Sequence, residues 1–175
     1  MTRQPEPEFS FILHPSELED TETTYELTAE SDECAALSER FQLKAIEGFN
    51  FILKMKPLRK ENAIRLRGKL YATVVQSCVV SMVLVTNIIE EEFEIFFREE
   101  SQIDNSGNEN IDRFEPYLAD TIDIGEIASE ELALAIDPYP RAAGIATDAL
   151  GPYLGKREDP GTKPFAGLAA LKRNK

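Results

Sequence analysis

The chain has 175 residues, enough for one domain that buries roughly 70% of the surface of its unfolded chain, so a core can form without disulfides. Its formal net charge of -13 at pH 7 argues against non-specific nucleic-acid binding, which relies on cations that displace counterions at phosphates. The two cysteines match no secreted scaffold, and an acidic N-terminus without a long apolar run predicts neither signal peptide nor membrane span, so we expect a cytoplasmic protein.

The first predicted elements are a short strand and a helix. Residues 1–30 combine a short strand at 9–13 with a Glu- and Thr-rich stretch that has little to bury, so their order is left open. A helix is predicted from Ser31, with Ser31 as its N-cap. Cys34, Leu37 and Phe41 follow at helical spacing and would line its buried face.

A two-residue periodicity near Gly48 predicts the first of three long amphipathic strands, and its inward side chains are Phe49, Phe51, Leu53 and Met55. The second strand spans 63–75, and its length makes Gly68 a candidate bulge. The third spans about 82–97. Hairpins between consecutive strands predict an antiparallel sheet.

Residues 98–116 are polar and acidic, which predicts a long mobile loop. A helix follows, which begins at the D-x-x-E pattern of Asp123 and ends before Pro138. The sequence therefore predicts an α+β fold: an antiparallel β-sheet of long amphipathic strands with a few packing helices and a long acidic loop. We expect an N-terminal segment at 1–30, a core at 31–140, and a Gly/Pro-rich tail at 141–175 with a short basic end.

Charge is segregated along the sequence. Basic against acidic residues number 2 to 11 over 1–40, 8 to 2 over 41–87, 2 to 16 over 88–137 and 7 to 3 over 138–175. Because interspersed signs would serve solubility equally well, this pattern indicates either that charged segments complement one another in the fold or that partners of opposite charge bind. A merely solvated surface is the simpler alternative.

Two sets of side chains are candidates for binding. Cations on neighbouring strands share one face of the sheet if the apolar faces are buried together. That face would suit RNA backbone and a stacked base. Its candidate RNA-binding residues are Lys54, Lys56, Arg65, Arg67, Lys69 and Tyr71. Candidates for contact with a basic partner are Glu90, Glu91, Glu92 and Glu94.

Motifs for catalysis are missing from the sequence. His14 is the only histidine, and no serine or cysteine has a base nearby in a recognisable pattern. No glycine pattern matches a phosphate-binding or dinucleotide-binding loop. Two cysteines and one histidine cannot complete a four-ligand zinc site without carboxylates. We therefore predict no enzyme, no cofactor, no metal and no small-molecule substrate.

Three segments, in the same order, resemble the YceD family of large ribosomal RNA subunit accumulation proteins. They are GKLYATVVQSCVVSMVLVTNIIEEEFEIFF, DTIDIGEIASEELALAIDPYPR and PFAGLAALKRNK. The QSC-VVS core is similar to the alphaproteobacterial branch in particular. The positions that carry the family motif are Gln76, Cys78, Asp123, Pro138, Pro164 and Phe165.

The resemblance implies a bacterial ribosome-assembly factor without known catalysis, which supports accumulation of large-subunit (23S) ribosomal RNA by binding RNA, a large-subunit ribosomal protein, or both. The alternative is a protein-only adaptor or holdase whose acidic surface shields a basic client. Many relatives carry a CxxC where Cys78 is followed here by Val79, Val80 and Ser81. This departure leaves no metal clasp to expect.

Overall fold

The structure is a computed structural model that describes residues 7–102 and 114–144. The chain divides into two compact units, Met1–Arg141 and Ala142–Lys175, and the elements below all belong to the first. In chain order they are β1 Ile12–Leu13, η1 Pro15–Glu17, β2 Thr23–Thr28, α1 Ser31–Arg40, β3 Ala45–Leu58, β4 Ala63–Ser77, β5 Leu84–Glu99, η2 Glu100–Gln102, β6 Glu115–Tyr117, β7 Ile122–Asp123 and α2 Ile124–Ala135. No helix among the described residues has the length and apolar character needed to cross a membrane.

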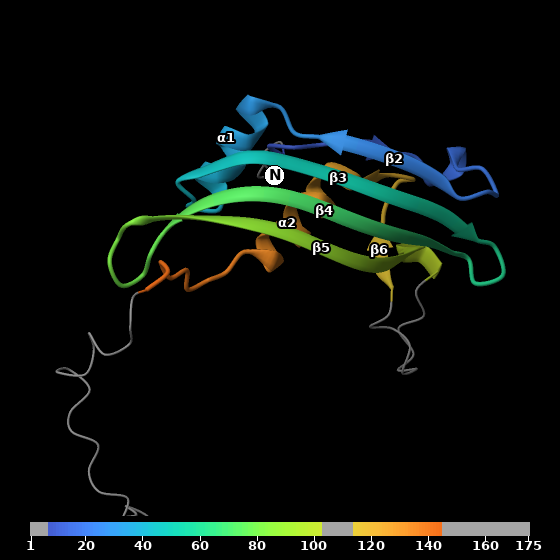
Figure 1. Ribbon diagram of the computed structural model, residues 1–175. Helices are drawn as coiled ribbons and strands as arrows, with labels where there is room; N and C mark the ends of the chain where they lie inside the picture. The colour runs from blue at the N-terminus through green and yellow to red at the C-terminus, as the bar shows by residue number, and fades with distance from the viewer. Residues whose placement is uncertain (1–6, 103–113, 145–175) are drawn as a thin grey trace, which may run out of the picture. The chain divides into compact units, whose positions relative to one another are not determined.

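The architecture is a five-stranded sheet in the order β2-β3-β4-β5-β6 (Figure 1). The strands β2 to β5 pair antiparallel, whereas β6 pairs parallel with β5, and β1 and β7 form a small separate ladder. The predicted α+β class is confirmed. The predicted antiparallel pairing of the three long strands is confirmed, and the structure adds β6 as a short parallel edge strand that the sequence did not predict.

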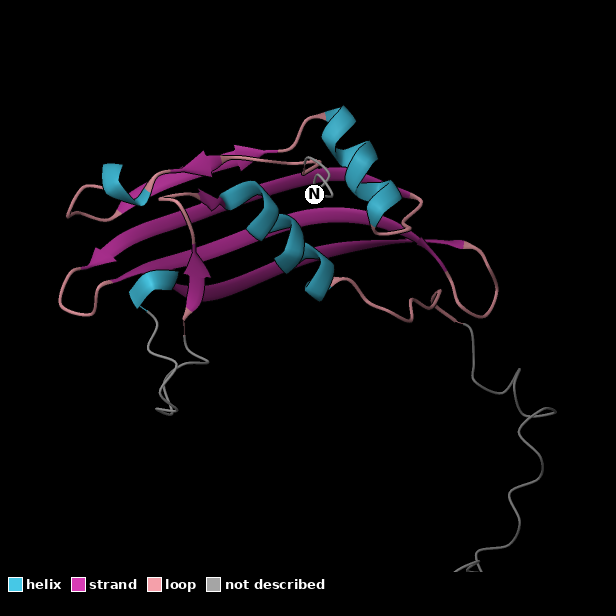
Figure 2. Cartoon of the chain, turned by 180° about the vertical axis from the view of Figure 1, so that it is seen from behind, coloured by secondary structure: helices cyan, strands magenta, loops and turns pink. Residues whose placement is uncertain are grey.

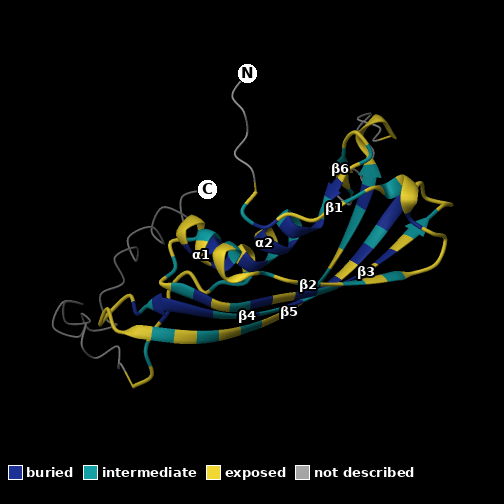
Figure 3. Ribbon diagram, turned by 90° about the horizontal axis from the view of Figure 1, so that it is seen from above, coloured by how far each residue is buried: buried dark blue, intermediate teal, exposed yellow. Residues whose placement is uncertain are grey.

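Both α-helices lie on the same face of the sheet (Figure 2). The core lies between these helices and the sheet. Phe49, Phe51, Leu53 and Met55 point into it, as the alternation predicted, and all four are almost fully buried. Leu37 of α1 and Leu132 of α2 are completely buried in the same cluster. The alternation of buried and exposed bands along the strands is visible in Figure 3. One face of the sheet is therefore covered and the other is open to solvent.

The order of the N-terminal segment, which the composition left open, can be described in the structure from residue 7 onward. The Glu- and Thr-rich stretch contains β2, which pairs with β3 and packs Tyr25 and Leu27 against the core. The helix begins at Ser31 as predicted, but its N-cap is Glu30, so the prediction of Ser31 as the cap is wrong. The carboxylate of Glu33 accepts a hydrogen bond from Glu30 N at 2.7 Å, which satisfies a main-chain donor at the helix start.

The predicted loop at 98–116 is wrong at both ends. The third strand starts later than predicted, at Leu84, and β5 continues to Glu99, where the short helix η2 follows. Glu115–Tyr117 forms β6, because its parallel pairing with β5 satisfies main-chain N–H and C=O groups. The composition of this segment gives no sign of that pairing. The interior of this loop, 103–113, and the predicted basic end of the tail lie outside the described residues.

Gly68 is not a bulge. The register is continuous through Leu53, Gly68 and Phe93, and the irregularity between β3 and β4 lies at Ile46/Gly48 instead. A Cβ on Gly68 would lie 2.4 Å from Phe93 Cζ and 2.7 Å from Phe51 Cε2. These two rings stack at a centroid distance of 5.6 Å, so glycine is needed for the rings to meet over β4.

We predict that Gly68→Ala destabilises the fold by about 1–3 kcal/mol, because the added methyl group overpacks the buried ring of Phe51 and the half-buried ring of Phe93. The matched control is Gly48→Ala, where an added Cβ meets nothing within 4 Å, and its effect should be neutral or slightly stabilising. Urea unfolding followed by circular dichroism measures both. Equal midpoints for the two variants would contradict the role given to Gly68.

Candidate functional site

The open face of the sheet brings the predicted cations together. Lys54 lies opposite Arg67, and Lys56 lies opposite Arg65, across the β3–β4 ladder. Lys69 and Tyr71 follow on the same side of β4. We call this surface the open face. The predicted binding residues that lie on it are Lys54, Lys56, Arg65, Arg67, Lys69, Tyr71, Glu90, Glu92 and Glu94.

Carboxylates of β5 neutralise the β4 cations on the open face. Arg67 Nε donates to Glu94 Oε1 at 2.7 Å, and Lys69 Nζ lies 2.7 Å from Glu90 Oε1 and 3.0 Å from Glu92 Oε1. The hydrogen bond that Arg67 donates to Glu94 raises the pKa of Arg67, and the hydrogen bond that Lys69 donates to Glu90 raises the pKa of Lys69. The basic block and part of the acidic block thus complement each other within the fold, which is one of the two outcomes that charge segregation predicted.

Two cations of the open face differ from the rest. Lys54 and Lys56 are exposed, and neither forms an ion pair with any residue in the ranges 7–102 and 114–144. Arg65, beside Lys56, is paired with Glu22 Oε2 at 3.2 Å. Lys69 Nζ lies 5.1 Å from the centroid of the Tyr71 ring, which is half-buried. The free positive charge of this face is therefore concentrated on β3.

The four glutamates proposed for a basic partner do not share one face. Glu90, Glu92 and Glu94 belong to the open face, whereas Glu91 lies opposite Leu70, which is on the helix-covered side. Glu91 acts there on Glu131 of α2, and their like charges contribute to a raised pKa of Glu131. The alternation of a strand separates adjacent acids that look like one cluster in the sequence.

A groove lies on the helix-covered side of the sheet, between α2 and the strands β5 and β6, with a volume of about 590 Å³. We call it the α2 groove. Its apolar lining includes Ile95, Phe97, Leu118, Ile127 and Leu134. Its acidic lining includes Glu100, Glu115, Glu126, Glu130 and Glu131.

Electrostatics in the α2 groove are unfavourable for its own carboxylates. Burial and then the neighbouring Glu126 raise the pKa of Glu130, and burial and then Glu130 raise the pKa of Glu131. Arg40 of α1 relieves part of this repulsion, since its guanidinium lies 2.6 Å from Glu126 and 2.9 Å from Glu8. Glu130 and Glu131 were not among the candidate residues that the sequence indicated. The available signal was the i,i+4 spacing of Glu126 and Glu130 on a predicted helix.

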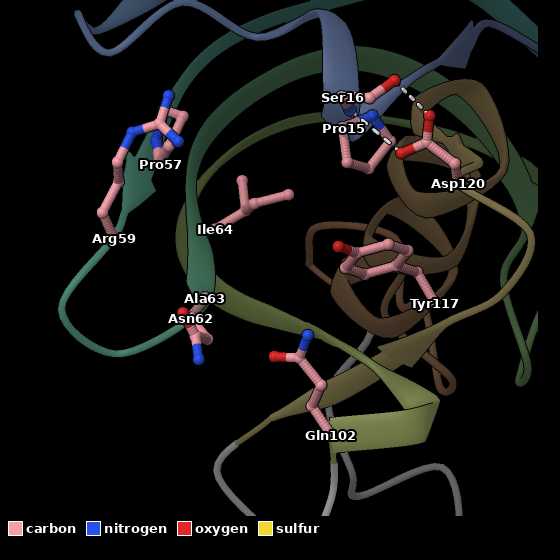
Figure 4. A pocket seen from close by; sticks show the side chains of 10 residues that line it. All are labelled: Pro15, Ser16, Pro57, Arg59, Asn62, Ala63, Ile64, Gln102, Tyr117 and Asp120. Atoms are coloured by element: carbon pink, nitrogen blue, oxygen red, sulfur yellow. Dashed lines mark hydrogen bonds between the residues drawn. The ribbon is translucent and has the colours of Figure 1, made fainter.

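A second pocket, of about 530 Å³, lies where the N-terminal segment meets the β3–β4 turn and β6 (Figure 4). Asp120 accepts hydrogen bonds from the main-chain N–H of Ser16 at 2.9 Å and from the Ser16 hydroxyl. The Nδ1 of His14 lies 2.9 Å from the main-chain oxygen of Asp120. These contacts hold the N-terminal segment on the turn before β7, which is a structural task.

The family-motif residues fall in two places. Gln76 donates to Asp137 O at 2.8 Å, and the N–H of Val79 donates to Pro140 O at 2.9 Å, so the β4–β5 turn is joined to the proline turn after α2. Cys78 is fully buried in that turn, and its Sγ accepts from Val80 N and Ser81 N. The described residues hold no group of three ligating side chains around it.

Asp123, another residue of the family motif, holds the start of α2. Its carboxylate accepts from Glu126 N at 3.2 Å, which confirms the predicted D-x-x-E cap, and from Phe11 N at 2.9 Å. Pro138 lies at the exposed proline turn, while Pro164 and Phe165 lie outside the described residues. The motif positions seen in the structure therefore organise α2 and its connections.

An open charged sheet face and an acidic, apolar groove on the opposite side define an α+β protein whose described surfaces suit contact with charged macromolecules. Residues 66–172, more than half of the chain, match the family described as Large ribosomal RNA subunit accumulation protein YceD, and the chain belongs to this family. That description implies a role in accumulation of the RNA of the large ribosomal subunit. No curated protein and no solved structure matches the chain. The family indicated by the sequence motifs is confirmed, and the alphaproteobacterial branch stays a prediction.

We predict that Glu130→Gln with Glu131→Gln raises stability at neutral pH. The pKa values of Glu130 and Glu131 are higher in the folded state than in the unfolded state, so ionisation of these two groups at neutral pH lowers the stability of the fold. This loss of stability disappears as the pH falls below the unfolded-state pKa values and both groups become protonated. The gain over the parent should therefore shrink on acidification, as measured by urea midpoints at several pH values.

Glu8→Gln provides the control of opposite sign. A hydrogen bond from its own main-chain N–H, together with Arg40, lowers the pKa of Glu8, so its ionised form stabilises the fold above the carboxyl range. This variant should lose stability at neutral pH and match the parent in acid. A double α2 variant that is less stable than the parent at neutral pH would contradict the electrostatic account of the groove.

Proposed function

We propose that the protein supports accumulation of large-subunit (23S) ribosomal RNA as a non-catalytic binding module, and that its open face contacts the RNA. The coarse role follows from membership of the YceD family. The contact surface and the absence of catalysis belong to the proposal. A role in ribosome assembly also implies action in the cytoplasm of a bacterium.

The observation that carries this proposal is that Lys54 and Lys56 on β3 form no ion pair with any residue that the structure describes. Lys54 and Lys56 project from neighbouring outward positions of one strand, about 7 Å apart along the chain, which is close to the spacing of successive phosphates in a nucleic-acid strand. A lysine without an internal partner can displace a counterion from a phosphate and so contribute to affinity. Tyr71 on β4 offers a ring for base stacking.

The cations of β4 are held back by their carboxylate partners. Phosphates that approach Arg67 or Lys69 must compete with Glu94, Glu90 and Glu92, which are already at hydrogen-bonding distance. Such competition lowers the affinity for arbitrary RNA. It favours an RNA site whose phosphates lie at the positions of Lys54 and Lys56. A protein with a net negative charge can therefore bind one RNA site selectively without binding RNA non-specifically.

We predict that Lys54→Gln with Lys56→Gln weakens binding to a 23S ribosomal RNA transcript by about tenfold or more at moderate salt. Each lost phosphate contact should also reduce the slope of log affinity against log salt by up to about one unit. Filter binding over a salt series measures both quantities. The matched control is Lys44→Gln with Arg141→Gln, which removes the same charge from exposed sites away from the open face.

A gain-of-binding variant sharpens the test. Glu90→Gln with Glu92→Gln leaves Lys69 without its carboxylates, so RNA affinity should rise if phosphates use this face. If the lysine variant binds RNA as its charge-matched control does, and the glutamate variant binds RNA no better than the parent does, RNA does not use this face and the proposed contact is overturned.

A protein-only adaptor that shields a basic client is the second candidate. Glu91 favours it, because this carboxylate turns away from the β4 cations and joins the acids of α2. On this account, neutralising Glu90, Glu91, Glu92 and Glu94 abolishes association with a basic large-subunit ribosomal protein, while Lys54→Gln with Lys56→Gln leaves it intact.

A further inference from the structure

The α2 groove has an apolar floor that the RNA contact does not use. Phe97 is buried at its base, and Ile95 and Ile127 are half-buried on its walls. Two leucines at its edges are strongly exposed, Leu118 with 61% and Leu134 with 80% of its surface accessible. Exposed apolar side chains at the edges of a cavity are typical of a surface that is covered by a partner.

Acidic side chains surround this floor. The described residues that line the groove include no lysine and no arginine, whereas five glutamates and Asp123 belong to the lining. Arg40 cannot neutralise them all, since its guanidinium is divided between Glu126 and Glu8. Glu115, Glu130 and Glu131 form no ion pair with a cation among the residues that the structure describes, and Glu91 adds a further negative charge nearby.

We propose that the α2 groove binds a basic amphipathic peptide segment of a partner protein, with apolar side chains on the floor and lysine or arginine side chains at the glutamates. Charge complementarity selects this occupant. RNA would place phosphates against carboxylates, and a second copy of this chain would bring the same acidic rim to a two-fold contact. A segment with both apolar and cationic side chains satisfies the floor and the rim together.

This inference is independent of RNA contact by the open face, because the two surfaces lie on opposite sides of the sheet. A cation bound at the rim would also relieve the repulsion that raises the pKa of Glu130 and Glu131. Binding should therefore weaken as these two groups become protonated. The partner recognises the protein through α2, whose start is held by the family-motif residue Asp123.

The test uses the full chain and a synthetic peptide rich in lysine and leucine, with binding followed by fluorescence anisotropy. Leu134→Asp and, separately, Glu130→Gln with Glu131→Gln should each weaken binding by about tenfold. The matched control is Glu26→Gln with Glu47→Gln, which removes the same charge from exposed sites outside the groove and should change affinity by less than about twofold. Far-UV circular dichroism verifies that each variant folds.

Several results would overturn the proposal. If Glu26→Gln with Glu47→Gln weakens peptide binding as much as the groove variants do, the acidic protein attracts the peptide without a defined site. If Leu134→Asp binds the peptide with the affinity of the parent, the apolar floor is not used. Higher affinity of a full chain with Leu168→Asp and Leu171→Asp shows that its own C-terminal segment is the occupant. If the parent protein sediments as a dimer and Leu134→Asp sediments as a monomer, a second copy of the chain is the occupant of the groove. Groove variants that keep RNA binding while losing the peptide separate this inference from the proposed RNA contact.

Discussion

The position of β4 between β3 and β5 is the constraint on which the remaining features depend. Its fifteen residues, Ala63–Ser77, pair along nearly their whole length with both neighbours, so one alternation decides the direction of every side chain in three strands. The stacking of Phe51 and Phe93 over Gly68 favours this register, because any slip would place a Cβ under the rings. A slip by one residue would also bury the cations of β4.

The same register creates the two surfaces that matter for function. On the open side it sets Arg67 against Glu94 and Lys69 against Glu92, so most cations of the sheet are neutralised internally. On the other side it sends Glu91 toward α2, where carboxylates gather around an apolar groove. The open face thus carries two lysines on β3 that form no ion pair with a described residue, whereas the α2 groove is strongly negative.

Much of the fold could be predicted from local patterns. The alternation at 49–55 identified the core face of β3, and Asp123 marked the start of α2, because both signals are local. The predictions failed where distant segments decide the outcome. Gly68 is explained by rings on two other strands, and β6 exists only through its pairing with β5. The cap of α1 is a local exception, because Glu30 and Glu33 form a reciprocal capping box one residue before the predicted cap.

For the candidate sites, the sequence by itself determined that cations alternate along β3 and β4, that acids follow in β5, and that family motifs mark Gln76, Cys78 and Asp123. Only the tertiary structure decided which charges neutralise each other, because an ion pair depends on which strands are neighbours and in what register. It also separated Glu91 from Glu90 and Glu92. The α2 groove arises in the same way, since its floor and rim come from β5, β6 and α2, which meet only after the chain has folded.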